Sequence, residues 1–129
     1  MKSVSKSAFS PDLDEVQAEV YKHSWIRDDP FFSMNAFVGE LGELSNVLKK
    51  EVYAEMMPNY SARVAAEVLT GKRTSFQEQK IDEAGDTLFF FVQTLNACKL
   101  NLNEVWNNQM DKLRKQGASL GSEGKIFRK

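Results

Sequence analysis

Apolar residues recur along this chain at steps of three and four positions, the spacing that gathers side chains on one face of a helix. Only three prolines and seven glycines interrupt the pattern, and the long intervals between them do not alternate as strands do. The pattern predicts four main helices, over residues 13–27, 33–57, 76–99 and 104–116, with a short helical stretch over 61–69. The chain is therefore expected to be all-α.

The expected helix ends carry residues that cap helices. Asp12 follows Pro11 and precedes Glu15 by three positions, which is the spacing of a capping box. Asn103 is expected to cap the last helix, and Pro58 is expected to lie just past the end of the second one. The chain is interpreted as one domain over residues 1–129, in which residues 1–11 and 117–129 form flexible tails.

Two of the predicted helices have a strongly apolar face, and we expect these faces to pack together as the core. The two faces consist of Met34, Phe37, Leu41, Leu44, Leu48 and Val52, and of Ile81, Ala84, Leu88, Phe91, Val92, Leu95 and Cys98. Cys98 is accordingly expected to be an inert buried thiol. The run Phe89–Phe91 points in three directions on a helix, and an oligomer interface is the simplest account of it.

Composition excludes several classes of protein. The 17 basic and 18 acidic residues leave a net charge of -1, which is not the footprint of a nucleic-acid-binding surface. The longest apolar run, over residues 88–92, is far shorter than the roughly 20 residues that cross a bilayer. The single cysteine cannot form an internal disulfide, and no apolar segment near the start has signal-peptide length. A cytoplasmic location is therefore expected.

Two pairs of acidic residues carry the candidate chemistry. Glu40 and Glu43 lie in the string GELGEL, and Glu83 and Asp86 lie in DEAGD. Residues three apart project from the same side of a helix, so four carboxylates converge if the two helices pack together. Such a group needs a counter-charge, and an all-oxygen set favours Mg²⁺ or Mn²⁺. The competing interpretation is that both pairs are ordinary solvated helix faces.

The segments around these acids resemble a known family. GELGELSNVLKKE and DEAGDTLFFFVQTLNACKLNLNEVWNNQMDKLRKQ are similar to the MazG-like members of the all-α nucleoside triphosphate pyrophosphohydrolases, with the likeness extending over residues 12–116. The resemblance implies a four-helix-type bundle that assembles as a homodimer or homotetramer. It also implies Mg²⁺-dependent hydrolysis of a nucleoside triphosphate to the monophosphate and pyrophosphate, with Mn²⁺ as a substitute metal.

The resemblance also implies roles for individual residues. Glu40, Glu43, Glu83 and Asp86 take the metal-binding and catalytic positions, and Glu40 is the candidate that orients or deprotonates the attacking water. Relatives often place aromatic or polar residues that meet the nucleoside before the first acidic pair, where this chain has His23 and Trp25. The phosphate-binding candidates are Lys112, Arg114, Lys115 and, in the tail, Lys125.

This chain departs from the family pattern at two places. The connection between the two acidic pairs is longer than usual, so residues 58–78 are interpreted as an insertion. The last helix has Leu113 near the position where many relatives have an asparagine after a lysine. The substrate is expected to be a deoxynucleotide, with a purine such as dGTP slightly favoured. Two alternatives stay open: a phosphoribosyl-ATP pyrophosphohydrolase-like enzyme, and a non-enzymatic helical module whose acidic groove binds a basic partner.

Overall fold

The structure of the protein is a computed structural model that describes residues 12–25 and 28–117. Within these residues it is helical, without a β-strand, which confirms the all-α prediction. The helices are α2 (Leu13–His23), α3 (Pro30–Met56), α4 (Pro58–Leu69), α5 (Phe76–Ala97) and α6 (Leu102–Gly117). The expected tails, apart from Gly117, lie outside the described residues. No helix in the described part of the chain is long and apolar enough to span a membrane.

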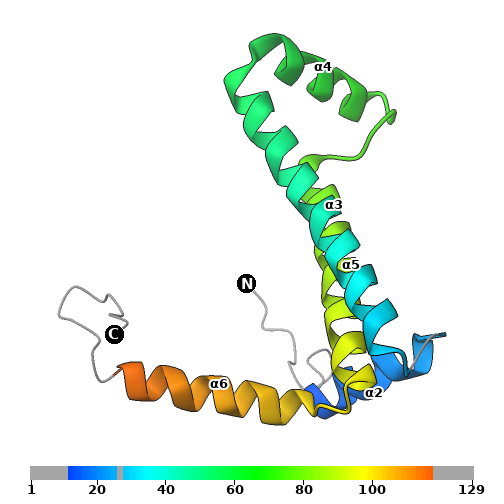
Figure 1. The fold of residues 1–129 in the computed structure, drawn as a ribbon. Helices are drawn as coiled ribbons and strands as arrows, with labels where there is room; N and C mark the ends of the chain where they lie inside the picture. The colour runs from blue at the N-terminus through cyan, green and yellow to red at the C-terminus, as the bar shows by residue number, and fades with distance from the viewer. Residues whose placement is uncertain (1–11, 26–27, 118–129) are drawn as a thin grey trace, which may run out of the picture.

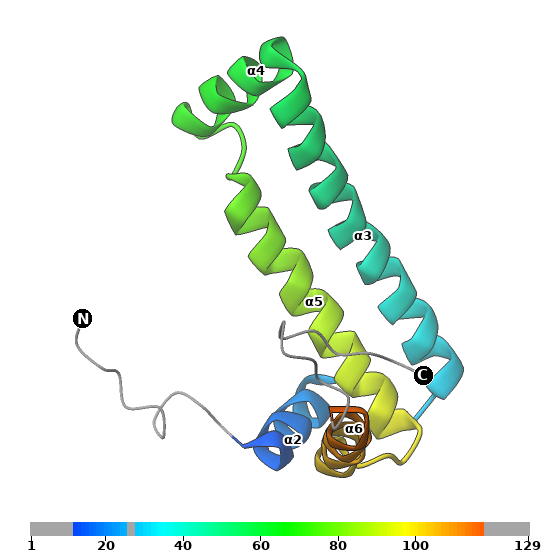
Figure 2. The same cartoon turned by 90° about the vertical axis from the view of Figure 1, so that its left-hand side faces the viewer.

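A long antiparallel hairpin of α3 and α5 organises the molecule (Figures 1 and 2). α4 joins the far ends of the two long helices, and α2 packs against α5 at the opposite end, called here the foot of the hairpin. α6 leaves the foot as a separate arm that contacts α2. The hairpin is therefore the element against which the other helices are placed.

Two helices begin earlier than the sequence pattern indicated, and both begin with proline. α3 starts at Pro30, where Asp29 accepts a hydrogen bond from the backbone N–H of Phe32 at 2.9 Å. α4 starts at Pro58, immediately after α3 ends. Proline suits the first turn because the N–H that it lacks has no partner within the helix there. The expected starts at residues 33 and 61 were therefore three residues too late.

The residues that cap the helix starts agree with the prediction for one helix and differ for another. Asp12 accepts a hydrogen bond from the backbone N–H of Glu15 at 2.8 Å, which confirms it as the cap of α2. The prediction for α6 was wrong, because Asn101 rather than Asn103 accepts the bond from the N–H of Glu104, at 2.9 Å. Both asparagines belong to the same NLN turn, so spacing alone did not separate them.

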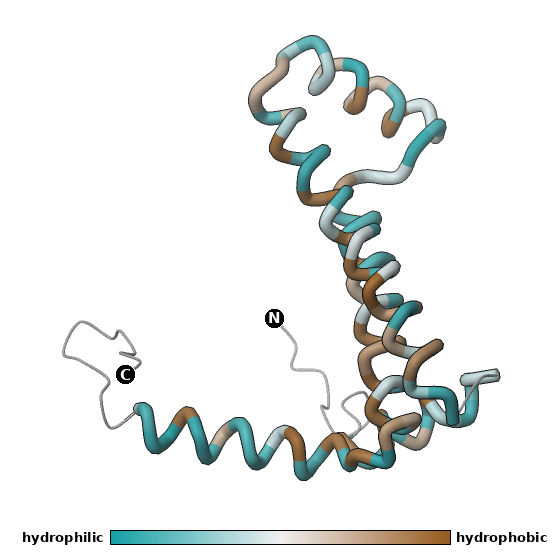
Figure 3. The backbone as a smooth tube through the Cα atoms, in the orientation of Figure 1, coloured by the Kyte–Doolittle hydropathy of each residue, from teal (hydrophilic) through white to brown (hydrophobic). Residues whose placement is uncertain are grey.

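The core of the single chain is small. Its buried apolar residues, among those described, are Val20, Val47, Ala54, Val64, Val92, Leu95 and Ala97. Most of the expected core face stays accessible: Leu41 is 46% exposed and Leu88 is 58% exposed. Figure 3 shows apolar positions recurring along α3, α5 and α6. Cys98 is also exposed, at the end of α5, which corrects its assignment as a buried thiol.

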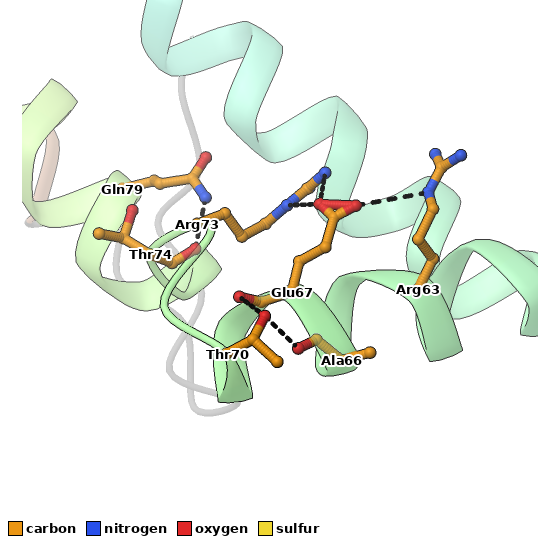
Figure 4. A network of polar contacts seen from close by, with 7 residues as sticks. All are labelled: Arg63, Ala66, Glu67, Thr70, Arg73, Thr74 and Gln79. Carbon is orange, nitrogen blue, oxygen red and sulfur yellow. Dashed lines mark hydrogen bonds and ion pairs between the residues drawn. The ribbon is translucent and has the colours of Figure 1, made fainter.

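Residues 58–78, interpreted as an insertion, form an ordered unit. Glu67 on α4 binds Arg73 in the following loop at 2.8 Å and lies 3.8 Å from Arg63 one turn earlier (Figure 4). Gly71 has a φ of 76°, the left-handed conformation that glycine adopts without strain. Gln79 on α5 donates to the carbonyl of Thr74 at 2.8 Å. These contacts fix the loop between α4 and the start of α5.

Gln17 joins α2 to the turn between α5 and α6. Its side chain donates to the carbonyl of Leu100 and accepts from the N–H of Leu102, both at 2.7 Å. Its backbone carbonyl also accepts from Asn96 at 3.3 Å. One residue therefore supplies much of the polar contact that sets where α6 begins.

We predict that Gln17→Ala lowers the free energy of unfolding by about 1–2 kcal/mol, because a backbone donor and a backbone acceptor lose their partner. Chemical denaturation followed by circular dichroism measures the change. Gln77→Ala, at an exposed position of α5, is the matched control and should change stability little. Equal losses in the two variants would contradict the role given to Gln17.

Candidate metal centre

Three of the four predicted carboxylates meet midway along the hairpin. Glu40 on α3 and Glu83 and Asp86 on α5 each offer one oxygen atom, and these atoms all lie within 4.8 Å of one another. Glu83 and Asp86 share a side of α5 because they are three positions apart. Packing of α3 against α5 then places Glu40 opposite them. The expected convergence of the two acidic helix segments is thus present in the fold.

Glu43, the fourth predicted ligand, is exposed and lies outside this close group. Glu43 still interacts electrostatically with the group, because its charge is among those that raise the pKa of Glu83. Glu43 follows Glu40 by three positions and projects from the same side of α3. It is therefore placed at the edge of the group rather than inside it.

The electrostatics of the group centre on Glu83. Partial burial raises the pKa of Glu83 above its ordinary value, and the charges of Asp86, Glu43, Glu40 and Asp82 raise it further. A nearby cation, Lys80, is bound to a different acid: its Nζ lies 3.0 Å from both carboxylate oxygens of Glu51. The group thus concentrates negative charge that a bound cation would stabilise.

The donor set fits a hard divalent cation. Mg²⁺ and Mn²⁺ prefer carboxylate and water oxygens, and three carboxylates leave several coordination positions for water or phosphate oxygens. Glu40 and Glu83 are half-buried, whereas Asp86 is exposed, so the group is open to solvent on one side. Such an arrangement can hold an ion and present it to a ligand from outside.

An aromatic pocket lies toward the foot of the hairpin. It is shallow, enclosing about 30 Å³ within about 280 Å³ of space that includes open solvent, and it is lined by Ser24, Trp25, Phe32, Ser33, Phe89, Phe90 and Gln93. The rings of Trp25 and Phe32 meet edge to face at 5.9 Å, as do those of Phe89 and Phe90 at 5.3 Å. The buried amide of Gln93 donates to the hydroxyl of Ser33 at 3.4 Å. The pocket therefore combines aromatic walls with a polar pair.

The pocket and the carboxylates lie on the same side of the hairpin. Ser33 precedes Glu40 by seven residues on α3, and Gln93 follows Asp86 by seven residues on α5. Seven residues make about two turns, which keeps the direction of a side chain and advances about 10 Å along the helix. The two features are thus neighbours along one side of the α3–α5 contact.

The two residues predicted to meet the nucleoside are placed differently. Trp25 lines the pocket and is 82% exposed, so one of its faces is open to a ligand. His23 lies on α2 with its Nε2 atom 3.5 Å from Glu19, and it does not line the pocket. Sequence reasoning missed Phe32, Ser33 and Gln93 as pocket residues. Phe89 and Phe90 also line this pocket, and the oligomer interface expected for the run Phe89–Phe91 stays a prediction.

A sequence signal could have found part of the pocket. Phe89, Phe90 and Gln93 follow Asp86 by three, four and seven positions, which extends the acidic side of α5 by two turns. Ser33 extends the side of Glu40 in the same way on α3. Because these residues are uncharged, a search based on acidic residues did not select them.

The predicted phosphate-binding residues do not gather at the carboxylates within one chain. Lys112, Arg114 and Lys115 belong to α6, which projects away from the hairpin (Figure 1). Arg114 is paired with Asp111 at 3.0 Å. Lys125 lies outside the described residues.

Comparisons with protein-family models, with curated proteins and with solved structures found no match to this chain.

We predict that Glu83→Gln stabilises the metal-free protein by a few degrees in Tm at pH 7, because it removes a repelled charge. The pKa of Glu83 is raised in the folded state, so ionisation of this residue costs stability as the pH rises above the ordinary glutamate value. The gain should therefore disappear at low pH. Thermal unfolding at several pH values in a chelator checks this.

Added Mg²⁺ should make the wild type more stable than Glu83→Gln. Binding to the folded state alone stabilises the wild type by about 2.7 kcal/mol at a concentration 100 times Kd, and the variant should gain much less. Glu55→Gln removes an exposed carboxylate elsewhere on α3 and should behave like the wild type. If Mg²⁺ stabilises wild type and Glu83→Gln equally, the ion binds somewhere else.

Proposed function

We propose that the protein is a Mg²⁺-dependent hydrolase that splits a nucleoside triphosphate into the monophosphate and pyrophosphate. The observation that carries this proposal is the close group of Glu40, Glu83 and Asp86, formed by two helices that are far apart in the sequence. Its donor chemistry suits Mg²⁺, and Mg²⁺ held by carboxylates commonly serves phosphate substrates.

The carboxylates of the group have different proposed roles. Glu40, Glu83 and Asp86 would hold the ion, with Glu43 adding negative charge at the edge of the group. When bound, Mg²⁺ offsets the charge of the triphosphate and polarises its phosphoryl oxygens. Glu40 orients the attacking water and accepts its proton, as the family resemblance suggests. Hydrolysis adds one water across the bond between the α- and β-phosphates, so pyrophosphate leaves and the nucleoside keeps one phosphate.

The aromatic pocket receives the base. Trp25 and Phe32 provide rings on which a base can stack, and the hydroxyl of Ser33 and the amide of Gln93 can hydrogen-bond to its edge. Support comes from position, since the pocket lies about two helical turns, or about 10 Å, from the carboxylates on the same side of the hairpin. A sugar and its phosphates can bridge that separation. The proposed substrate is a deoxynucleotide, with a purine such as dGTP slightly favoured.

A phosphate-release panel tests the activity. The purified protein with Mg²⁺ is given each of the eight standard ribo- and deoxynucleoside triphosphates, with and without an added inorganic pyrophosphatase. We expect phosphate only when the coupling enzyme is present, and a loss of at least about a hundredfold in Glu40→Gln and Glu83→Gln. Glu55→Gln should keep full activity.

If no phosphate is released from any nucleotide, in Mg²⁺ or in Mn²⁺, the proposed activity on standard nucleotides is overturned. Phosphoribosyl-ATP would then be the next substrate to test. If it too is untouched, a binding module with an acidic groove is the account that remains. Release of phosphate without the coupling enzyme would indicate cleavage at the terminal phosphate instead.

We predict that Trp25→Ala raises KM for the preferred nucleotide by about tenfold, because the base loses a stacking surface worth about 1–3 kcal/mol. The value of kcat should change much less, since Trp25 lies outside the carboxylate group. Steady-state kinetics measures both constants. His23→Ala, at an exposed position outside the pocket, is the control, and an equal effect in that variant would argue against the pocket as the base site.

A further inference from the structure

One ion pair joins the two long helices close to the carboxylates. The Nζ atom of Lys80 on α5 lies 3.0 Å from both carboxylate oxygens of Glu51 on α3. The two side chains are 29% and 31% exposed, whereas every other lysine in the described part of the chain is exposed. Lys80 is also the only basic residue of α5. The contact between the helices therefore holds one half-buried cation.

The ion pair lies beyond the carboxylates in the direction of α4. Lys80 precedes Glu83 by three residues on α5, which places it about 60° around that helix and about 4.5 Å along it. Glu51 follows Glu40 by eleven residues on α3, about three turns, and returns to the same direction within about 20°. From its foot toward α4, the hairpin thus carries the aromatic pocket, the carboxylates and this ion pair (Figure 1).

A nucleoside triphosphate bound in the same order brings its terminal phosphates toward Lys80. With the base in the pocket and the α-phosphate at the carboxylates, the β- and γ-phosphates extend further toward α4. These two phosphates leave as pyrophosphate, and a cation beside them offsets charge that a bound Mg²⁺ leaves uncompensated. Lysine suits this position because its ammonium group binds phosphate as a mobile point charge at the end of a flexible stem.

The other cations of the hairpin are less well placed. Among the described residues of α3 and α5 these are Lys49 and Lys50, and both are exposed. They follow Glu40 by nine and ten residues, which is about 14 and 15 Å along α3. Lys80 is within about 4.5 Å of Glu83 along α5. It is therefore the lysine of the hairpin that lies nearest to the carboxylates along a helix.

We propose that Lys80 exchanges Glu51 for the β- and γ-phosphates of the bound nucleotide, and so holds the part of the substrate that leaves as pyrophosphate. The exchange is feasible because Glu51 keeps 31% of its side chain exposed, so water can solvate its carboxylate after Lys80 moves. This role rests on the proposed function, and it adds a residue that favours a triphosphate over a monophosphate.

Isothermal titration calorimetry in saturating Mg²⁺ tests the role of Lys80. The ligands are the α,β-methylene analogues of the standard deoxynucleoside triphosphates and the matching monophosphates. We expect Lys80→Met to raise the Kd of the bound analogue about tenfold, because a charge-assisted contact is lost, and to leave the Kd of its monophosphate unchanged. Glu51→Gln breaks the same ion pair but keeps Lys80, so it should bind the analogue at least as tightly as the wild type.

Lys49→Met is the matched control, because it removes an exposed lysine from the side of α3 opposite Glu40. It should bind both kinds of ligand as the wild type does. The proposal is overturned if Lys80→Met binds the analogue normally or weakens the monophosphate equally, or if Glu51→Gln also weakens the analogue. In each case the proposed activity still stands. A wild type that binds none of the analogues would overturn the proposed function together with this role.

A measurement on the unaltered protein decides the question if Lys80→Met does not fold. Acetylation of lysines, followed by peptide mass spectrometry, reports how accessible each Nζ atom is. Bound analogue should slow the acetylation of Lys80 several-fold, whereas the monophosphate should not, and Lys49 should react equally in all samples. If the analogue and the monophosphate have the same effect on Lys80, its Nζ does not bind the terminal phosphates.

Discussion

Carboxylates of like charge are held together in this protein by the packing of two helices. The contact between α3 and α5 places oxygens of Glu40, Glu83 and Asp86 within 4.8 Å of one another. The cost of this approach appears in the raised pKa of Glu83, which follows from partial burial and from the neighbouring charges. Helix packing thus works against electrostatic repulsion, and a bound cation would remove that conflict.

The two sides of the hairpin have different chemistry. One side combines the carboxylates with the pocket that Trp25 and Gln93 line, which supports a role in binding a phosphate ester with an attached base. The other side exposes apolar side chains from both helices.

The sequence predicted those features that depend on local chemistry and helical spacing. The cap at Asp12 and the convergence of Glu40, Glu83 and Asp86 follow from spacings of three residues on helices that pack together. The start of α3 at Pro30 was missed, because proline was taken as an interruption although the first turn accommodates it.

The assignment of the core was right for Val92 and Leu95, which are buried, and wrong for most of the other positions. The most apolar positions, such as Leu41 and Leu88, were expected to face each other, but α3 and α5 meet along a surface that includes Ser33, Val47 and Thr94. Hydrophobic spacing identifies faces suited to burial without telling which partner buries them. The pocket was missed because Phe89 and Phe90 looked like surplus apolar residues, and their proximity to Trp25 exists only in the folded chain.

Anomalous diffraction from crystals grown with Mn²⁺ and a non-hydrolysable nucleotide would show whether these carboxylates hold an ion beside the phosphates. We expect a strong anomalous peak at coordination distance, about 2 Å, from oxygens of Glu40, Glu83 and Asp86, with phosphate oxygens completing the shell. Crystals that show the nucleotide elsewhere, with no ion at these carboxylates, would contradict it.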